Sequence, residues 1–140
     1  MKLYLIISRK NLSIILSILI AVTVSVGMVS SLRLKRIDGS TNEVRTEYLK
    51  RLKIGVDDSG VTAKEITIPE NFSGVYKQYN EVQKKSGFDL SRYKGKTVTL
   101  YSYPIIGDNK KAELLVYKNS IIGGSIVPDE LGQPTEPLKK

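Results

Sequence analysis

Two absences limit the chemistry that the side chains of this chain can perform. The 140-residue sequence contains no histidine and no cysteine, which excludes thiolate and imidazole metal sites, Ser-His-Asp triads, Cys-His dyads and disulfides. Catalysis would have to use carboxylates, lysine, tyrosine or serine. The sequence has 14 acidic residues, but no pair among them has a spacing typical of a general acid and base. We therefore predict a non-enzymatic protein with no cofactor and no metal site.

Loops that bind phosphate or calcium are also missing from the sequence. The glycines of the C-terminal half do not form a GxxxxGK[ST] or GxGxxG pattern. The segment 57–60, DDSG, starts like an EF-hand loop, but Thr62 stands where that loop needs glycine and Ile68 where it needs glutamate. This segment is therefore predicted to be an ordinary turn.

One group of side chains could form a binding surface. Arg92, Lys94 and Lys96 alternate around Tyr93, so these four residues are a possible interaction patch that is both basic and aromatic. A solvated turn is the simpler interpretation, because charged side chains are mostly exposed. Both interpretations place the four residues in a turn that precedes a strand.

The net charge of +8 does not indicate a nucleic-acid-binding protein. Residues 1–36 contain six of the 22 basic residues and no acidic one, which leaves 16 basic against 14 acidic residues in the remainder. The excess thus flanks an apolar segment, where basic residues are expected beside anionic lipid head groups. We predict no nucleic-acid partner.

That apolar segment runs from Leu12 to Leu32 and contains no charged residue. As a helix it would span about 31 Å, the thickness of the hydrocarbon core of a bilayer. We predict an uncleaved, single-pass signal anchor in the cell membrane, with the C-terminal domain outside the cytoplasm. The alternative is a signal peptide whose cleavage releases a secreted domain, but the apolar run is longer than in most signal peptides.

The remaining sequence predicts an α+β fold, with about four antiparallel strands packed by two helices. Ser40 and Glu43 have the form of a capping box before a helix over 42–52. Apolar residues at helical spacing from Phe72 to Val82 predict a second helix that ends at Gly87, with Val75, Tyr76, Tyr79 and Val82 on its buried face. Strands are predicted over 61–68, 97–103, 112–117 and 121–127.

These elements divide the chain into three parts. Residues 1–36 are the basic tail and transmembrane anchor, residues 37–127 are the α+β domain, and residues 128–140 are predicted to be a disordered tail, since they are polar and rich in proline. In the last strand, Gly123 and Gly124 indicate a bulge or a close approach of the backbone to another element. Val98 and Leu100 of one strand, and Leu114 and Val116 of the next, are predicted to face the core.

The segments GFDLSRYKGKTVTLYSY (87–103) and AELLVYKNSIIGGSI (112–126) resemble a family of small single-pass membrane proteins of Gram-positive spore-forming bacteria. These proteins carry a C-terminal domain of unknown function, and the similarity covers about residues 43–127. The resemblance implies an anchored extracytoplasmic domain with the order helix, strand, helix, three strands, and it implies no activity or ligand. Lys53 is a departure, because glycine often ends the first helix in this family.

We expect the protein to be an uncharacterised binding or interaction module. Its predicted partners are the lipid bilayer, through Leu12 to Leu32, and a protein or a component of the cell envelope. The enzymatic alternative is a hydrolase of cell-envelope polymers that uses two carboxylates. That alternative requires acidic side chains that converge in a pocket and have raised pKa values.

Overall fold

The computed structural model describes residues 17–18, 36–130 and 132–139. The predicted anchor, Leu12 to Leu32, lies outside these residues except for Ser17 and Ile18. Within the described part of the chain, no helix has both the length and the apolar character needed to cross a membrane. Contacts divide the chain into two units at residues 35 and 36, and the second unit is a small α+β domain.

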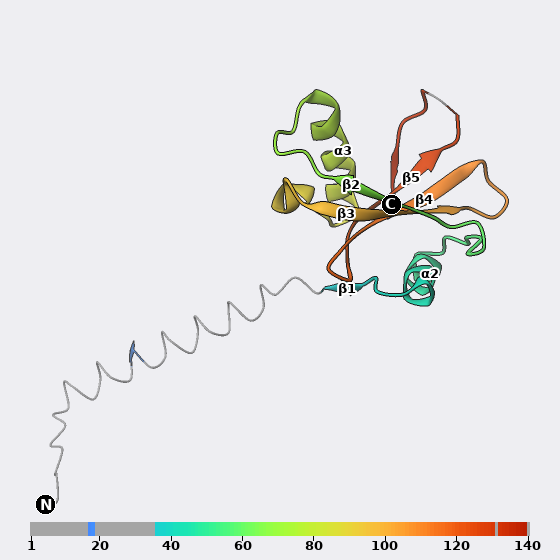
Figure 1. The fold of residues 1–140 in the computed structure, drawn as a ribbon, viewed down its shortest axis with the longest axis horizontal. Helices are drawn as coiled ribbons and strands as arrows, with labels where there is room; N and C mark the ends of the chain where they lie inside the picture. The colour runs from blue at the N-terminus through green and yellow to red at the C-terminus, as the bar shows by residue number, and fades with distance from the viewer. Residues whose placement is uncertain (1–16, 19–35, 131, 140) are drawn as a thin grey trace, which may run out of the picture. The chain divides into compact units, whose positions relative to one another are not determined.

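The domain contains two helices and one antiparallel sheet with the strand order β1-β5-β4-β3-β2 (Figure 1). A further short strand, β6, pairs with β5. In chain order the elements are β1 (Ile37–Asp38), α2 (Asn42–Arg51), β2 (Thr62–Thr67), α3 (Gly74–Lys85), the 3₁₀ turn η1 (Leu90–Tyr93), β3 (Thr97–Pro104), β4 (Lys110–Tyr117), β5 (Ser120–Pro128) and β6 (Glu136–Pro137). The predicted order of helices and main strands is confirmed, and the sheet gains β1 and β6 at its edge.

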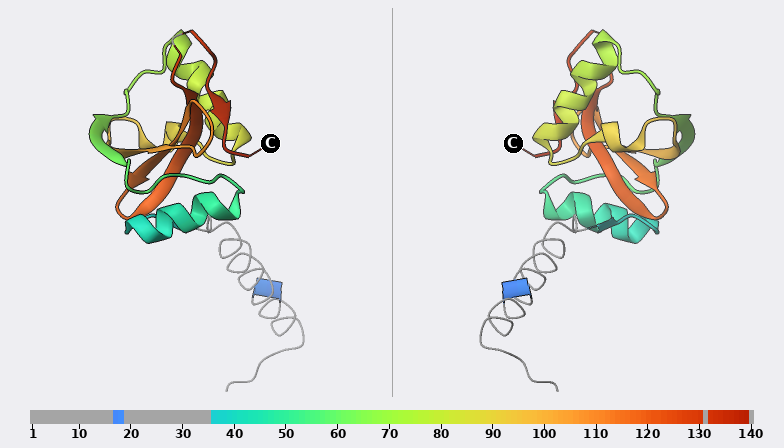
Figure 2. Two further views of the ribbon diagram at one scale, coloured as in Figure 1. Left: turned by 90° about the vertical axis from the view of Figure 1, so that its right-hand side faces the viewer. Right: turned by 90° about the vertical axis from the view of Figure 1, so that its left-hand side faces the viewer.

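The sheet is covered on both faces, by α2 on one side and by α3 on the other (Figure 2). Leu114 and Val116 pack in the cluster that contains Tyr48 and Leu49 of α2. Val98 and Leu100 belong to the opposite cluster, which includes Tyr76 and Tyr79 of α3. Both pairs therefore face a core, as predicted, but on opposite sides of the sheet, because the register pairs Leu100 with Leu115 and so turns Leu114 to the other side.

Helix α2 begins and ends with backbone geometry that only partly follows the prediction. Its N-cap is Thr41 and not Ser40, and the Thr41 hydroxyl accepts a hydrogen bond from the amide of Val44. At the other end, Lys53 adopts the left-handed conformation with φ of 63°. The Ile54 amide donates to the Leu49 carbonyl and the Lys53 amide to the Lys50 carbonyl, which is the Schellman pattern.

Helix α3 is held to the sheet by polar groups as well as by its tyrosines. Val75 is 83% exposed, so its predicted burial is wrong, and the side chains buried most completely are Asn80 and Gln83. The Gln83 carboxamide oxygen accepts from the amide of Gly124 at 2.6 Å. The Asn80 oxygen accepts from the amide of Leu90 at 2.8 Å and thereby fixes η1 to the helix. Gly87 has a φ of 85° and ends the helix as predicted.

A buried arginine joins α2 to the sheet. Arg45 is 6% exposed, and its Nε and Nη1 donate to the Tyr103 hydroxyl and to the Gly39 carbonyl, each at 2.8 Å. Its guanidinium lies 3.6 Å from the centre of the Tyr101 ring. The π face and the two oxygens offset the cost of burying this charge.

The glycine pair of β5 lies where the sheet is most crowded. The register between β4 and β5 shifts at Leu115 and Val116, which confirms the predicted bulge. A methyl group added at Gly123 would lie 2.9 Å from the Leu115 side chain, and one added at Gly124 would clash with Leu138. The prediction of a close approach is therefore also confirmed.

The described part of the C-terminal segment is folded and includes Leu138. The predicted disorder of the tail is therefore wrong for these residues. Strand β6 pairs with Ser125 and Ile126 of β5, and Leu138 is 5% exposed within the α2-side core. Its amide donates to the Ser86 hydroxyl at 2.8 Å. One buried leucine and a few backbone hydrogen bonds are enough to order a polar segment against a sheet edge, which composition does not reveal.

Candidate functional site

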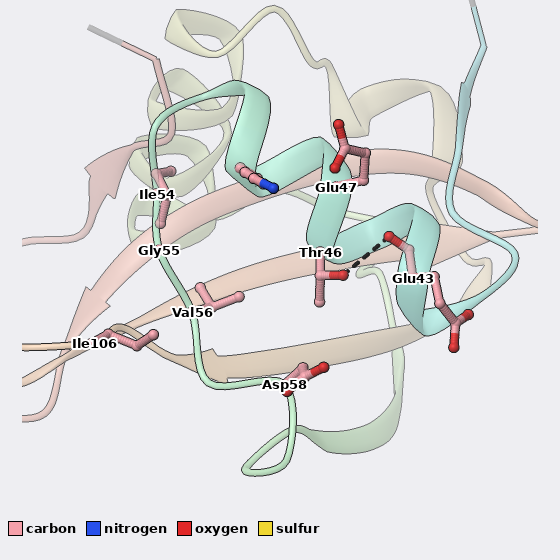
Figure 3. A pocket seen from close by; sticks show the side chains of 9 residues that line it. Glu43, Thr46, Glu47, Ile54, Gly55, Val56, Asp58 and Ile106 are labelled. Atoms are coloured by element: carbon pink, nitrogen blue, oxygen red, sulfur yellow. Dashed lines mark hydrogen bonds between the residues drawn. The ribbon is translucent and has the colours of Figure 1, made fainter.

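An open groove of about 470 Å³ lies beside α2 and is the candidate binding site (Figure 3). One wall is the outer face of α2, and the other comes from the segment after the helix and from the β3–β4 loop. The groove is lined by Glu43, Thr46, Glu47, Lys50, Ile54, Gly55, Val56, Asp58 and Ile106. It therefore combines a polar and charged wall on α2 with a largely apolar second wall.

The segment 54–58 is held in place by backbone hydrogen bonds to the end of β3. The Schellman turn at Lys53 reverses the chain after α2, and Val56 then forms an isolated antiparallel bridge with Ile105. The amide of Asp57 donates to the Pro104 carbonyl at 2.9 Å, and the amide of Ile106 donates to the Gly55 carbonyl at 3.0 Å. These contacts give the groove a rigid second wall, which favours a preformed site.

Three of the nine groove residues are acidic and one is basic. Glu43, Glu47 and Asp58 are exposed, and hydrogen bonding to its own backbone amide and to the Thr41 hydroxyl lowers the pKa of Glu43. The carboxylate of Glu43 is therefore ionised at neutral pH. Lys50 is the basic residue of the groove, so the groove carries a net negative charge in a chain whose overall charge is +8.

Ile106 is the apolar side chain most available to a ligand in this groove. It is 70% exposed and precedes the glycine turn of the β3–β4 hairpin. Ile54 and Val56 are half-buried behind it, since both pack against the α2-side core. Sequence reasoning missed the groove because its residues come from three separate segments, although an isoleucine beside Gly107 in a turn is a detectable signal.

The four residues of the predicted interaction patch lie away from this groove. Arg92, Lys94 and Lys96 are exposed. Tyr93 is half-buried against the α3-side core, and its ring contacts that of Tyr117 edge-on, with centroids 5.8 Å apart. The patch therefore consists of three exposed cations around a tyrosine that also has a packing role.

Glu113 of β4 is a candidate for the general acid of the hydrolase alternative. Burial raises the pKa of Glu113, as a general acid requires. However, its cross-strand neighbours are Ser102 and Ser125 rather than a second acid. The described residues also contain no cluster of three or more Asp and Glu residues that could hold a metal ion.

A protein-family model described as a domain of unknown function (DUF4830) matches residues 48–126. This match covers more than half of the chain, so the chain belongs to that family. It agrees with the predicted C-terminal domain of unknown function. Searches of the curated proteins and of the solved structures gave no match.

Proposed function

We propose that this member of the DUF4830 family is a membrane-anchored bacterial binding module that holds its α+β domain outside the cytoplasm. The anchor is the uncharged segment from Leu12 to Leu32, bracketed by basic residues. The binding site is the acidic groove beside α2, and this groove is the observation that carries the proposal. Its ligand is a segment of a partner protein that has both basic and apolar side chains.

The chemistry of the groove supports this choice of ligand. The carboxylates of Glu43, Glu47 and Asp58 favour lysine or arginine side chains through charge complementarity, which mainly raises specificity and the association rate. The exposed Ile106 and the half-buried residues behind it provide apolar area, and burial of such area supplies most of the affinity in interfaces of this kind. A ligand with only one of the two features would leave half of the groove unmatched.

Binding of a ten-residue peptide of alternating lysine and leucine to the full chain in detergent tests the site. Glu47→Lys and Ile106→Ser should each weaken binding of this peptide at least about fivefold, the equivalent of about 1 kcal/mol. Glu65→Lys is the matched control, because Glu65 is exposed on β2, outside the groove, and should leave the dissociation constant unchanged. Equal effects of Glu47→Lys and Glu65→Lys would show only non-specific attraction and would overturn the site.

Membrane fractionation combined with N-terminal sequencing tests the anchor. The proposal expects the chain in the membrane fraction with its first residues intact, and expects added protease to degrade the domain in cells without a cell wall. A soluble product that begins near Met28 would instead support the secreted, cleaved form.

A further inference from the structure

Basic side chains gather at the end of the sheet where the domain begins. Arg92, Lys94 and Lys96 follow α3, and Lys118 is in the β4–β5 hairpin, whose residues Lys118 and Asn119 have φ of 46° and 61°. The pairing of Thr99 with Val116 puts the start of β3 and this hairpin at the same end of the sheet. We call Arg92, Lys94, Lys96 and Lys118, with Tyr93 and Tyr117, the basic end.

Aromatic rings lie beneath two of these cations. Tyr93 and Tyr117 make the edge-on contact already described, and the Lys118 Nζ lies 5.4 Å from the centre of the Tyr117 ring. The Lys94 Nζ lies 5.0 Å from the centre of the Phe72 ring. The basic end therefore combines ammonium groups with tyrosine rings, residue types that suit the boundary between protein and lipid head groups.

The chain enters the domain at this same end. Asp38 of β1 pairs with Ser120, and the amide of Gly39 donates to the Asn119 carbonyl at 3.0 Å. Figure 1 shows β1 and the β4–β5 hairpin close together, with the β3–β4 hairpin on the far side of the domain. A segment that precedes Ile37 therefore reaches the domain beside the basic end.

The short connection to the apolar segment limits how far this end can be from a membrane. Leu32 and Ile37 are five residues apart, so even a fully extended chain separates them by at most about 18 Å. The head-group layer occupies about 5–8 Å of that distance. At full extension this leaves Ile37 about 10–13 Å beyond the head groups. A less extended connection brings the basic end within the distance of about 8 Å over which surface charges act at physiological ionic strength.

We propose that the basic end docks on the anionic surface of the membrane that holds the anchor, and so orients the domain with the β3–β4 hairpin and Ile106 away from the lipid. This inference depends on the proposed membrane anchor. Asp38, Glu70 and Asp89 are acidic residues at the same end, and the four cations of the basic end, with Arg36 at the entry, outnumber them. Docking would keep the acidic groove accessible to a partner.

Spin labels on the full chain in lipid nanodiscs test the orientation. The sequence has no native cysteine, so Ser91→Cys in η1 and Asp108→Cys in the β3–β4 loop each give one labelled site. The readout is collision of the label with a nickel-chelating lipid. In discs that contain phosphatidylglycerol, the label at residue 91 should collide with the nickel lipid at least about twice as often as the label at residue 108.

Charge-reversal variants then test whether the basic residues cause the difference between the two labels. The double variant Lys94→Glu and Lys96→Glu should abolish the difference between the two labels, as should discs of phosphatidylcholine alone. The double variant Lys64→Glu and Lys85→Glu changes the net charge equally, and it should preserve the difference because both residues are exposed outside the basic end.

Three results would overturn the docking proposal. Equal collision rates at residues 91 and 108 in anionic discs would refute docking while the chain remains disc-bound, which leaves the proposed anchor intact. A difference that persists in phosphatidylcholine discs would refute the role of lipid charge and leave the basic end open to another anionic partner. A chain that does not enter discs at all would contradict the anchor and the docking together.

Discussion

The left-handed residue that ends α2 offers a sharp test of how this fold is stabilised. Lys53 has a φ of 63°, where a side chain with a Cβ costs about 1–2 kcal/mol. Glycine has no such cost, but it loses more conformational entropy on folding, which is worth about 0.5–1 kcal/mol, because the unfolded backbone is freer at glycine. Lys53→Gly should therefore increase the free energy of unfolding by about 0.5–1 kcal/mol.

The structure indicates that little else changes in this variant. The Lys53 side chain is exposed, and the Schellman hydrogen bonds from the amides of Lys53 and Ile54 use only backbone atoms. For a domain of this size, the expected gain corresponds to an increase in melting temperature of about 2–8 °C. Thermal unfolding of residues 36–140, followed by far-UV circular dichroism, measures it directly.

Two control substitutions should have the opposite sign. Gly87→Ala places a Cβ at a φ of 85° with no atom within 4 Å, so its loss of stability, about 1 kcal/mol, is purely conformational. Arg51→Gly lies in the last turn of α2 and should cost about the same amount through helix propensity. A melting temperature for Lys53→Gly at or below that of the parent chain would refute the reasoning.

Three further outcomes are expected. Arg45→Met should lower the free energy of unfolding by about 3 kcal/mol, because it removes two charged hydrogen bonds and a cation–π contact while relieving the burial of a charge. A double-mutant cycle with Tyr103→Phe should show coupling between the two residues. Additive effects would contradict the inferred bond between Arg45 and Tyr103. Hydrogen bonding from the Asn80 side chain, and then from Ser91, lowers the pKa of Asp89 to about 2. The stability that this carboxylate contributes is therefore complete above about pH 4 and lost as the pH falls towards 2, and Asp89→Asn should flatten the urea-melt stability profile in that range. Leu138→Ala should cost about 2 kcal/mol and speed hydrogen exchange at the β5 edge, whereas unchanged exchange would mean that β6 contributes little.

Local patterns in the sequence were sufficient for most of the secondary structure. Helical spacing, strand alternation and the turn residues gave the order of the two helices and four main strands, since those signals depend on neighbours within a few residues. Gly87 stops α3 as predicted, and the glycines at 123 and 124 marked the crowded bulge. The apolar run from Leu12 to Leu32 remains a sequence prediction, because it lies largely outside the described residues.

Tertiary contacts decided what local patterns could not. Which face of the sheet each strand residue occupies depends on the register of β3 with β4, and a shift of one residue exchanges the faces. The buried roles of Arg45, Asn80 and Gln83 depend on partners that are distant in sequence, which local patterns do not reveal. The same is true of the groove: Glu43, Asp58 and Ile106 become neighbours only because the chain turns at Lys53 and then binds to the end of β3.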